Sequence, residues 1–212
     1  MLGSTPGWPA VLAEGSVLLR PYRRSDARAW SEVRIANQAW LSPWESAPPG
    51  PWAEMNSTRA YLYVYRDMKR AARHGDSMPF AVCLREDGIE RLVGHINLGS
   101  IVRRAFGSAY VGYWVDSRVA GRGVIPTALA LAVDHAFGAG GLHRVEINIR
   151  PENGPSRRVV EKLGFREEAY HPRYMHIDGA WRDHLGYAMT SEEVAAEGGL
   201  VARWRRLRAN AQ

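Results

Sequence analysis

The segment between residues 109 and 150 constrains the fold of this 212-residue chain more than any other part of the sequence. Residues 109–116 and 144–150 alternate apolar and polar side chains, which is the period of a half-buried strand. Between them, residues 127–138 read TALALAVDHAFG, which predicts an apolar helix. A helix that crosses between two strands packs on one face of their sheet. We therefore expect a strand-helix-strand unit in the middle of the domain.

The flanking segments add strands and helices to this unit. Before it we expect a strand at 16–20, helices that begin near 26 and 57, and strands at 80–85 and 92–102. After it we expect a helix at 153–163, a hairpin of 165–177 and 181–190 that turns at Asp178-Gly179, and a last helix from about 191. This order predicts an α+β fold with a mixed sheet and helices on its faces.

Composition excludes several classes of protein. The only cysteine, Cys83, rules out an intramolecular disulfide and a cysteine-rich zinc site, which favours a cytoplasmic location. No stretch approaches the roughly 18 apolar residues of a membrane span, and residues 1–13 lack the features of a signal peptide. The net charge is +6, and all but two of the 28 basic residues are arginine. This charge suits RNA, a nucleotide cofactor or an acidic protein surface, so it does not select a function.

A glycine-containing loop links the strand that ends near residue 116 to the apolar helix. Gly121 and Gly123 let the backbone turn, so that amides between Gly121 and Ile125 point outward at the positive end of the helix dipole. Such an arrangement favours an anion, and Pro126 fits an early helical position. Two turn glycines are also typical of an ordinary loop, so a second motif has to support a phosphate site.

The second motif lies roughly 30 residues further on, where a strand leads to Asn153-x-x-Ser156 and a short helix that ends in Glu-Lys-Leu-Gly-Phe165. With the glycine loop it resembles the second half of the GNAT acetyltransferase superfamily. Within that superfamily the chain is similar to the RimJ/RimL branch of protein N-terminal acetyltransferases, over about 17–190 and on the segments LSPWE (41–45), GYWV (112–115), Asn153-x-x-Ser156 and WRDH (181–184).

The resemblance implies the GNAT fold, whose mixed, mostly antiparallel sheet splays apart where acetyl-CoA binds. No metal is implied. The residues expected to bind acetyl-CoA are Tyr113, Trp114, Val115, Gly121, Arg122, Gly123, Val124, Ile125, Asn153, Ser156 and Lys162. The family loop usually reads Arg/Gln-Gly-x-Gly-x-Gly/Ala, and this chain departs from it at Ala120 and Ile125. Because backbone amides supply most phosphate contacts there, we expect weaker binding rather than none.

Ser156 and Asn148 are the expected catalytic residues. By the resemblance, the Ser156 hydroxyl donates a proton to the departing thiolate, and Asn148, which replaces a glutamate found in some relatives, orients a water. A backbone N–H at a bulged end of the strand 113–115 polarises the acetyl carbonyl. Asn153 also fits the role of a helix cap, and Ser156 that of a first-turn residue.

The acceptor is expected to contact Trp44, Glu45, Glu146 and His176. Trp44 is equally well read as a packing anchor. No single base stands out, and Glu45, Glu146 and His176 are the candidates. An α-amine with a pKa of about 7.7–8.0 needs less help in losing its proton than a lysine at about 10.4. His95, His135 and His143 have no partner at metal-ligand spacing, which argues against a metal site.

These observations predict an N-terminal extension at 1–15, an acetyltransferase domain at 16–190 and a basic C-terminal helix at 191–212. The leading hypothesis is direct acetyl transfer from acetyl-CoA to the N-terminal α-amine of a protein, plausibly a ribosomal protein, by a monomer or homodimer. The alternatives are a small-amine acetyltransferase acting on an antibiotic or polyamine, a non-catalytic acetyl-CoA-binding protein that docks on ribosomes, and an RNA-binding module. The run Arg203-Trp-Arg-Arg-Leu-Arg208 fits ribosome or RNA contact, or a solvated basic face anchored by Trp204.

Overall fold

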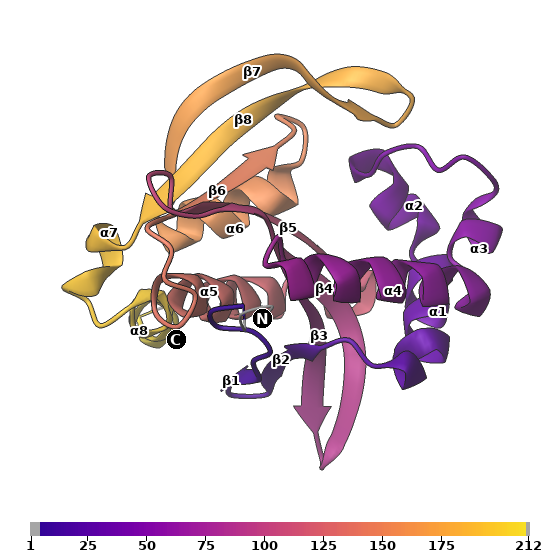
Figure 1. The fold of residues 1–212 in the computed structure, drawn as a ribbon, viewed down its shortest axis with the longest axis horizontal. Helices are drawn as coiled ribbons and strands as arrows, with labels where there is room; N and C mark the ends of the chain where they lie inside the picture. Colours follow the sequence, from indigo (N-terminus) through magenta and orange to yellow (C-terminus); the bar gives the residue numbers. More distant parts are fainter. Residues whose placement is uncertain (1–4, 211–212) are drawn as a thin grey trace.

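The computed structural model describes residues 5–210 and contains one eight-stranded sheet of order β1-β2-β3-β4-β5-β6-β8-β7 (Figure 1). The strands are β1 (Leu12–Glu14), β2 (Val17–Pro21), β3 (Met78–Glu86), β4 (Ile89–Val102), β5 (Ser108–Val115), β6 (Arg144–Ile149), β7 (Arg166–Ile177) and β8 (Ala180–Thr190). Among these strands only β5 and β6 pair in parallel. The predicted α+β fold with a mixed, mostly antiparallel sheet is confirmed.

Helices cover both faces of the sheet, as predicted. They are α1 (Ala27–Ala36), α2 (Gln38–Leu41), α3 (Trp52–Met55), α4 (Thr58–His74), α5 (Val124–Phe137), α6 (Gly154–Leu163), α7 (Glu192–Ala195) and α8 (Leu200–Ala209), with short 3-10 turns η1 (Arg24–Asp26), η2 (Ser42–Trp44) and η3 (Ser117–Val119). Helices α1 and α4 pack together on one face, while α5, α6 and α8 lie on the other.

Strand β3 contributes side chains to two hydrophobic cores, one on each face of the sheet. Phe80, Val82 and Leu84 join the core under α5, whereas Ala81 and Cys83 join the smaller core under α1 and α4. Successive side chains of a strand point to opposite faces, so a continuous apolar run is needed where both faces are covered. The Cys83 thiol is buried, and burial raises its pKa to about 12, which makes it a core residue rather than a nucleophile.

Local signals set the ends of the longer helices. The Ser57 side chain accepts from the backbone N–H of Ala60 at the start of α4, and Asn153 caps α6 in the same way. Gly75 and Gly164 end the two helices in the left-handed conformation, at φ +83° and +80°. The predicted helix starts near residues 57 and 153 are confirmed.

The structure differs from the sequence-based expectation in four places. Strand β1 lies inside the expected N-terminal extension and pairs with β2, and short helical turns at 42–44 and 52–55 flank an irregular stretch between the first two predicted helices. Helix α5 begins at Val124, directly after Gly123, rather than at residue 127. The prediction of a single C-terminal helix is wrong, because Gly198 and Gly199, both at positive φ, separate α7 from α8.

Helix α8 lies against α5 instead of projecting from the domain. Trp204 is buried and donates its indole N–H to the Thr127 hydroxyl at 2.8 Å, as the anchored-helix interpretation predicts. The basic side chains of α8 mostly pair within the chain, Arg205 with Glu14 and Arg206 with Glu197. Within residues 5–210, no helix has the length and apolar character needed to cross a membrane.

Candidate active site

A gap opens between β5 and β6. The two strands pair only from Ser108↔Arg144 to Tyr110↔Glu146, after which β5 continues beside β4 and β6 beside β8. This is the splay that the resemblance implied.

The walls of the gap carry unpaired backbone groups. Asp116 donates its N–H to Val93 on β4, so by strand alternation the backbone groups of Tyr113 and Val115 point the other way, into the gap. The Val115 carbonyl accepts from the Trp40 indole at 3.0 Å. The other backbone groups of Tyr113 and Val115 form a free strand edge, to which an extended molecule that carries amides can bind.

The glycine loop lies at one end of the gap. Gly121 and Gly123 adopt φ +78° and +77°, and a Cβ on Gly121 would meet nothing within 4 Å. Among the hydrogen bonds of residues 5–210, none uses the N–H of Gly121, Gly123, Val124 or Ile125. Several free donors thus sit at the N-terminus of the 14-residue helix α5. This arrangement suits a phosphate group.

A buried carboxylate fixes the start of that loop. Asp116 accepts from the Arg118 side chain and from Asn37 Nδ2 at 3.1 Å. Burial acts to raise the pKa of Asp116, but these hydrogen bonds outweigh it and hold the pKa below its usual range. Asn37 also accepts from the Ser117 N–H, so α1 holds the loop in place.

The first turn of α6 faces the gap from the other side. Asn153 Oδ1 accepts from the Ser156 N–H at 3.2 Å, and the Ser156 carbonyl accepts from the Tyr113 hydroxyl at 3.3 Å. Burial raises the pKa of Tyr113, which keeps that hydroxyl protonated. The structure therefore brings Tyr113, Asn153 and Ser156 together, while Asn153 performs the capping role that the sequence also allowed.

Basic side chains approach the loop, although not all are free. Arg122 points away and pairs with Glu86 at 2.7 Å. The ammonium of Lys162 lies 5.9 Å from the Trp204 ring centroid, and Trp204 would touch a Cβ on Gly123 at 3.4 Å. Helix α8 thus places Trp204 between Lys162 and the loop.

A polar cluster lies on the sheet face opposite α6. Asn148 projects from β6 on the face opposite the buried Ile147, and its amide lies 3.5 Å from the Tyr174 hydroxyl. The His171 and Tyr174 rings stack at 4.7 Å. A Cβ on Gly186 would lie 2.8 Å from His171 Nε2 and 3.4 Å from Asn148 Oδ1, so the absent side chain leaves room for both polar groups.

His184 packs against this polar cluster. Its ring packs edge-on against Tyr174 at 5.7 Å, and its Nδ1 lies 3.1 Å from the Arg182 carbonyl. Burial lowers the pKa of His184, so the buried imidazole is held neutral. The His171 side chain is more accessible than that of His184 and makes no hydrogen bond among the described residues.

Glu45 is engaged by a buried arginine. Both of its oxygens contact the Arg34 guanidinium, with Nη2 to Oε2 at 2.6 Å. Arg34 is buried, donates to Asn56 Oδ1 at 2.8 Å and lies 4.8 Å from the Trp52 ring centroid. The Arg34–Glu45 pair therefore forms part of a wall of the site, and a direct contact of Glu45 with the acceptor stays a prediction.

Two further contacts join the segment 42–52 to the strands across the gap. The Asp178 N–H at the tip of the β7–β8 hairpin donates to the Glu45 carbonyl at 3.1 Å, and Figure 1 shows the hairpin reaching toward α2. Arg150, after β6, donates to the Pro43 carbonyl at 2.7 Å and lies 5.3 Å from the Trp44 ring centroid. Trp44 is half-buried here, and both interpretations of this residue stay predictions.

Three other residues predicted for the site make contacts elsewhere in the chain as well, and their roles stay predictions. Trp114 does not face the gap: its backbone pairs with His95 and its ring lies 5.3 Å from Arg34 on the other core. His176 packs edge-on against Trp181 at the hairpin, and Glu146 pairs with Arg144 at 2.8 Å.

The bulge predicted at the end of β5 is absent from the described strand. Its pairing with β4 runs in register from Gly94↔Val115 to Gly99↔Tyr110. A break in register lies in the neighbouring strand pair, where Val93 interrupts the β3–β4 pairing between Val82 and Cys83.

Four residues that line the candidate site were not predicted from the sequence: Arg34, Trp40, His171 and Tyr174. Arg34 carried a usable signal, because an arginine among the apolar positions of a helix needs a buried partner. Trp40, His171 and Tyr174 meet their partners only through the tertiary fold. Within residues 5–210, no three His, Cys, Asp or Glu side chains gather in a way that could hold a metal ion.

Comparisons with known proteins agree with this geometry. Residues 16–166 match the acetyltransferase (GNAT) domain family. A probable N-acetyltransferase, YjcK of Bacillus subtilis, is 40% identical over 86% of this chain and 98% of its own. The [ribosomal protein uS5]-alanine N-acetyltransferase of Escherichia coli is 27% identical over 91% and 97%. The structure of Mycobacterium smegmatis RimJ in complex with CoA-disulfide superposes with a TM-score of 0.85, at 41% identity over 92% and 97%.

Proposed function

This chain belongs to the acetyltransferase (GNAT) family, and from that premise we propose that it acetylates the N-terminal α-amine of a protein, with a ribosomal protein as acceptor. Acetyl-CoA is the donor, as the CoA-bound RimJ structure supports. The observation that carries the proposal is the gap between β5 and β6, flanked by the free amides of the glycine loop and by the first turn of α6.

The gap accommodates the parts of acetyl-CoA by their chemistry. The pantetheine arm is extended and carries two amides, so it can pair with the free edge of β5 at Tyr113 and Val115. The pyrophosphate is an anion and matches the free N–H donors of Gly121, Gly123, Val124 and Ile125. Its thioester end then lies toward the first turn of α6, where the Ser156 backbone carbonyl accepts from the Tyr113 hydroxyl.

The acceptor approaches from the opposite face, over the polar cluster of Asn148, His171 and Tyr174. Its amine must be neutral to attack the acetyl carbonyl. Glu45 and Glu146 are engaged by arginines, so we place proton removal on the His171 imidazole, with Asn148 orienting the amine or a water. The amine nitrogen forms the new amide bond as the carbon–sulfur bond breaks, and Ser156 protonates the departing thiolate.

A protein N-terminus fits this arrangement better than a lysine side chain on two grounds. Its pKa of about 7.7–8.0 leaves a useful neutral fraction near pH 7.5, so a weak base is sufficient. The contacts of Arg150 with Pro43 and of Asp178 with Glu45 close the far side of the site, which favours a slender chain end over a side chain on a folded surface.

The test is an acetyl-transfer assay with peptides that begin with Ala, Ser, Thr or Met, beside spermidine and an aminoglycoside. We expect thiol release and a mass gain at the α-amine of the Ala or Ser peptides. The matched control is the same peptide with a blocked N-terminus and an internal lysine, which we expect to remain unmodified. Turnover only with the small amines would favour the small-amine alternative, and binding of acetyl-CoA without turnover would favour the non-catalytic alternative.

The role of Ser156 has its own test. The Ser156→Ala variant keeps the backbone N–H that Asn153 caps, so α6 is expected to form normally. Loss of a proton donor should lower kcat about tenfold to a hundredfold while the Kd for acetyl-CoA changes little. Equal turnover in the variant would exclude the proton-donor role. Ribosome contact through α8 and the oligomeric state stay predictions.

A further inference from the structure

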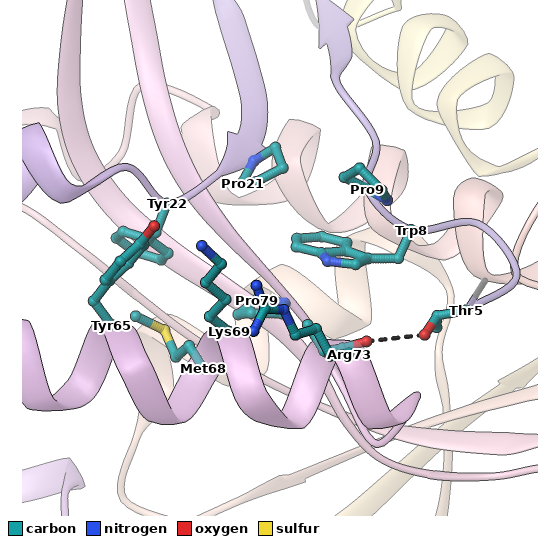
Figure 2. Close-up of a pocket in the computed structure, with 11 residues that line it drawn as sticks. Thr5, Trp8, Pro9, Pro21, Tyr22, Tyr65, Met68, Lys69, Arg73 and Pro79 are labelled. Carbon is teal, nitrogen blue, oxygen red and sulfur yellow. Dashed lines mark hydrogen bonds between the residues drawn. The ribbon is translucent and has the colours of Figure 1, made fainter. Parts of the chain in front are cut away.

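A second cavity of about 580 Å³ lies on α4, apart from the β5–β6 gap (Figure 2). It is bounded by α4, the ends of β2 and β3, and the N-terminal segment. The residues that line it are Thr5, Trp8, Pro9, Pro21, Tyr22, Tyr65, Met68, Lys69, Ala72, Arg73 and Pro79. Neither β5, β6 nor α6 contributes to its wall. Its volume is in the range of small-molecule sites.

Contacts within the protein hold the wall of this cavity in place. Thr5 donates to the Ala72 carbonyl at 2.9 Å, which ties the N-terminal segment to α4. Trp8 packs edge-on against Phe80 at 5.0 Å, and the Tyr22 hydroxyl lies 3.0 Å from His95 Nδ1. The cavity is therefore a preformed part of the fold and not a gap between loose segments.

The lining is mainly aromatic and apolar. Trp8 lies at one end, Tyr22 and Tyr65 lie at the other, and Met68 forms part of the floor between them (Figure 2). Flat rings and a thioether suit an apolar or aromatic body, because burial of such a surface is favourable without directional bonds. A sugar or another highly polar molecule would leave its hydroxyl groups without partners here.

Two cations project from α4 into the same space. Lys69 and Arg73 are four residues apart, so they lie on one face of the helix. Neither forms an ion pair with a carboxylate among the described residues, whereas Arg70 on another face pairs with Asp67 at 3.0 Å. The Lys69 ammonium lies 5.7 Å from the Tyr65 ring centroid, which keeps it beside the cavity. Charge complementarity thus selects an anionic group.

We propose that this cavity binds a small amphiphilic anion, a molecule with an aromatic or branched apolar body and one carboxylate, sulfonate or phosphate group. The body lies between Trp8 and Tyr65, and the anionic group lies between Lys69 and Arg73. This inference does not rest on acetyl transfer, since no residue of the proposed active site takes part.

The test uses two probes that share one aromatic body. 8-Anilinonaphthalene-1-sulfonate carries a sulfonate, and N-phenyl-1-naphthylamine is its uncharged counterpart. We expect the sulfonate to bind one per chain and about tenfold more tightly than the neutral probe, because charged contacts each add to binding. The double variant Lys69→Gln/Arg73→Gln should lose this preference but still bind the neutral probe, which shows that the cavity is intact.

The matched control is Arg66→Gln/Arg70→Gln, which removes the same charge from other positions of α4. It should keep the preference for the sulfonate. Added coenzyme A should leave binding unchanged. The proposal is overturned if the sulfonate does not bind, if it binds the Lys69/Arg73 variant as tightly as the unmodified protein, or if coenzyme A displaces it.

Discussion

At the residue scale, the Arg34–Glu45 ion pair organises the site, and breaking it would cost free energy because Arg34 is buried. Arg34 is surrounded by Trp30, Trp52 and Trp114, with its guanidinium 5.6, 4.8 and 5.3 Å from the three ring centroids. Indole rings attract a cation but do not neutralise it. Glu45 supplies the opposite charge, and its own backbone carbonyl carries the contact with Asp178. One ion pair thus fixes the segment 42–52 relative to α1 and the β7–β8 hairpin.

The Glu45→Gln variant tests this role. Removal of one partner leaves Arg34 buried without its counter-charge, so we expect the free energy of unfolding to fall by about 2 kcal/mol. Urea unfolding measures this loss, and Glu54→Gln, an exposed position on α3, is the control. If Glu45 instead binds the acceptor, its substitution would raise the KM for the peptide and leave the urea midpoint where it was.

At the element scale, the sequence predicted those features that depend on neighbours along the chain. The helix starts near residues 57 and 153 were predicted from their capping residues, and the Asp178-Gly179 turn was predicted because both residues favour positive φ, which they adopt at +51° and +73°. The engagement of Glu45, the placement of Trp114 and the Asn148–His171 cluster depend on contacts between distant segments. No local pattern encodes such contacts, which is why the sequence did not predict them.

Helix α8 is capped by a side chain from another helix. The Asp134 carboxylate on α5 accepts from the N–H of Leu200 at 2.6 Å and of Val201 at 2.9 Å, so it satisfies two free donors of α8. Gly199 allows this approach, since a Cβ there would lie 2.7 Å from Asp134 Oδ2. We expect Asp134→Ala to cost about 1–2 kcal/mol and to raise amide hydrogen exchange throughout residues 200–209.

Two variants complete that experiment. Gly199→Ala should reproduce the loss of protection in α8, because it forces the same cap apart and places a side chain at φ +102°. Asp67→Ala, an exposed carboxylate on α4, should leave α8 unchanged. Unaltered exchange in the Asp134 variant would show that Trp204 and its neighbours hold α8 without the cap.

At the scale of the whole molecule, the His95 imidazole connects the smaller core under α1 and α4 to the Trp114 ring. His95 lies on β4, its Nδ1 lies 3.0 Å from the Tyr22 hydroxyl, and its ring packs against the Trp114 ring at 6.3 Å. Burial, reinforced by the positive charge of Arg34, lowers the pKa of His95 to about 4. A proton on this ring is therefore unfavourable in the folded state.

The pH dependence of stability follows from that shift. An unfolded chain takes up this proton near pH 6.5, whereas the folded protein resists it until about pH 4, so the unfolded state holds more protons between these values. Stability is then fully present above pH 6.5 and falls as the pH is lowered toward 4, by about 3 kcal/mol for this group alone. Urea unfolding from pH 7 to pH 4 should give a flatter profile for His95→Gln than for the unmodified protein. Parallel profiles would mean that His95 titrates normally in the folded state, and the acid sensitivity would then belong to paired carboxylates such as Asp116.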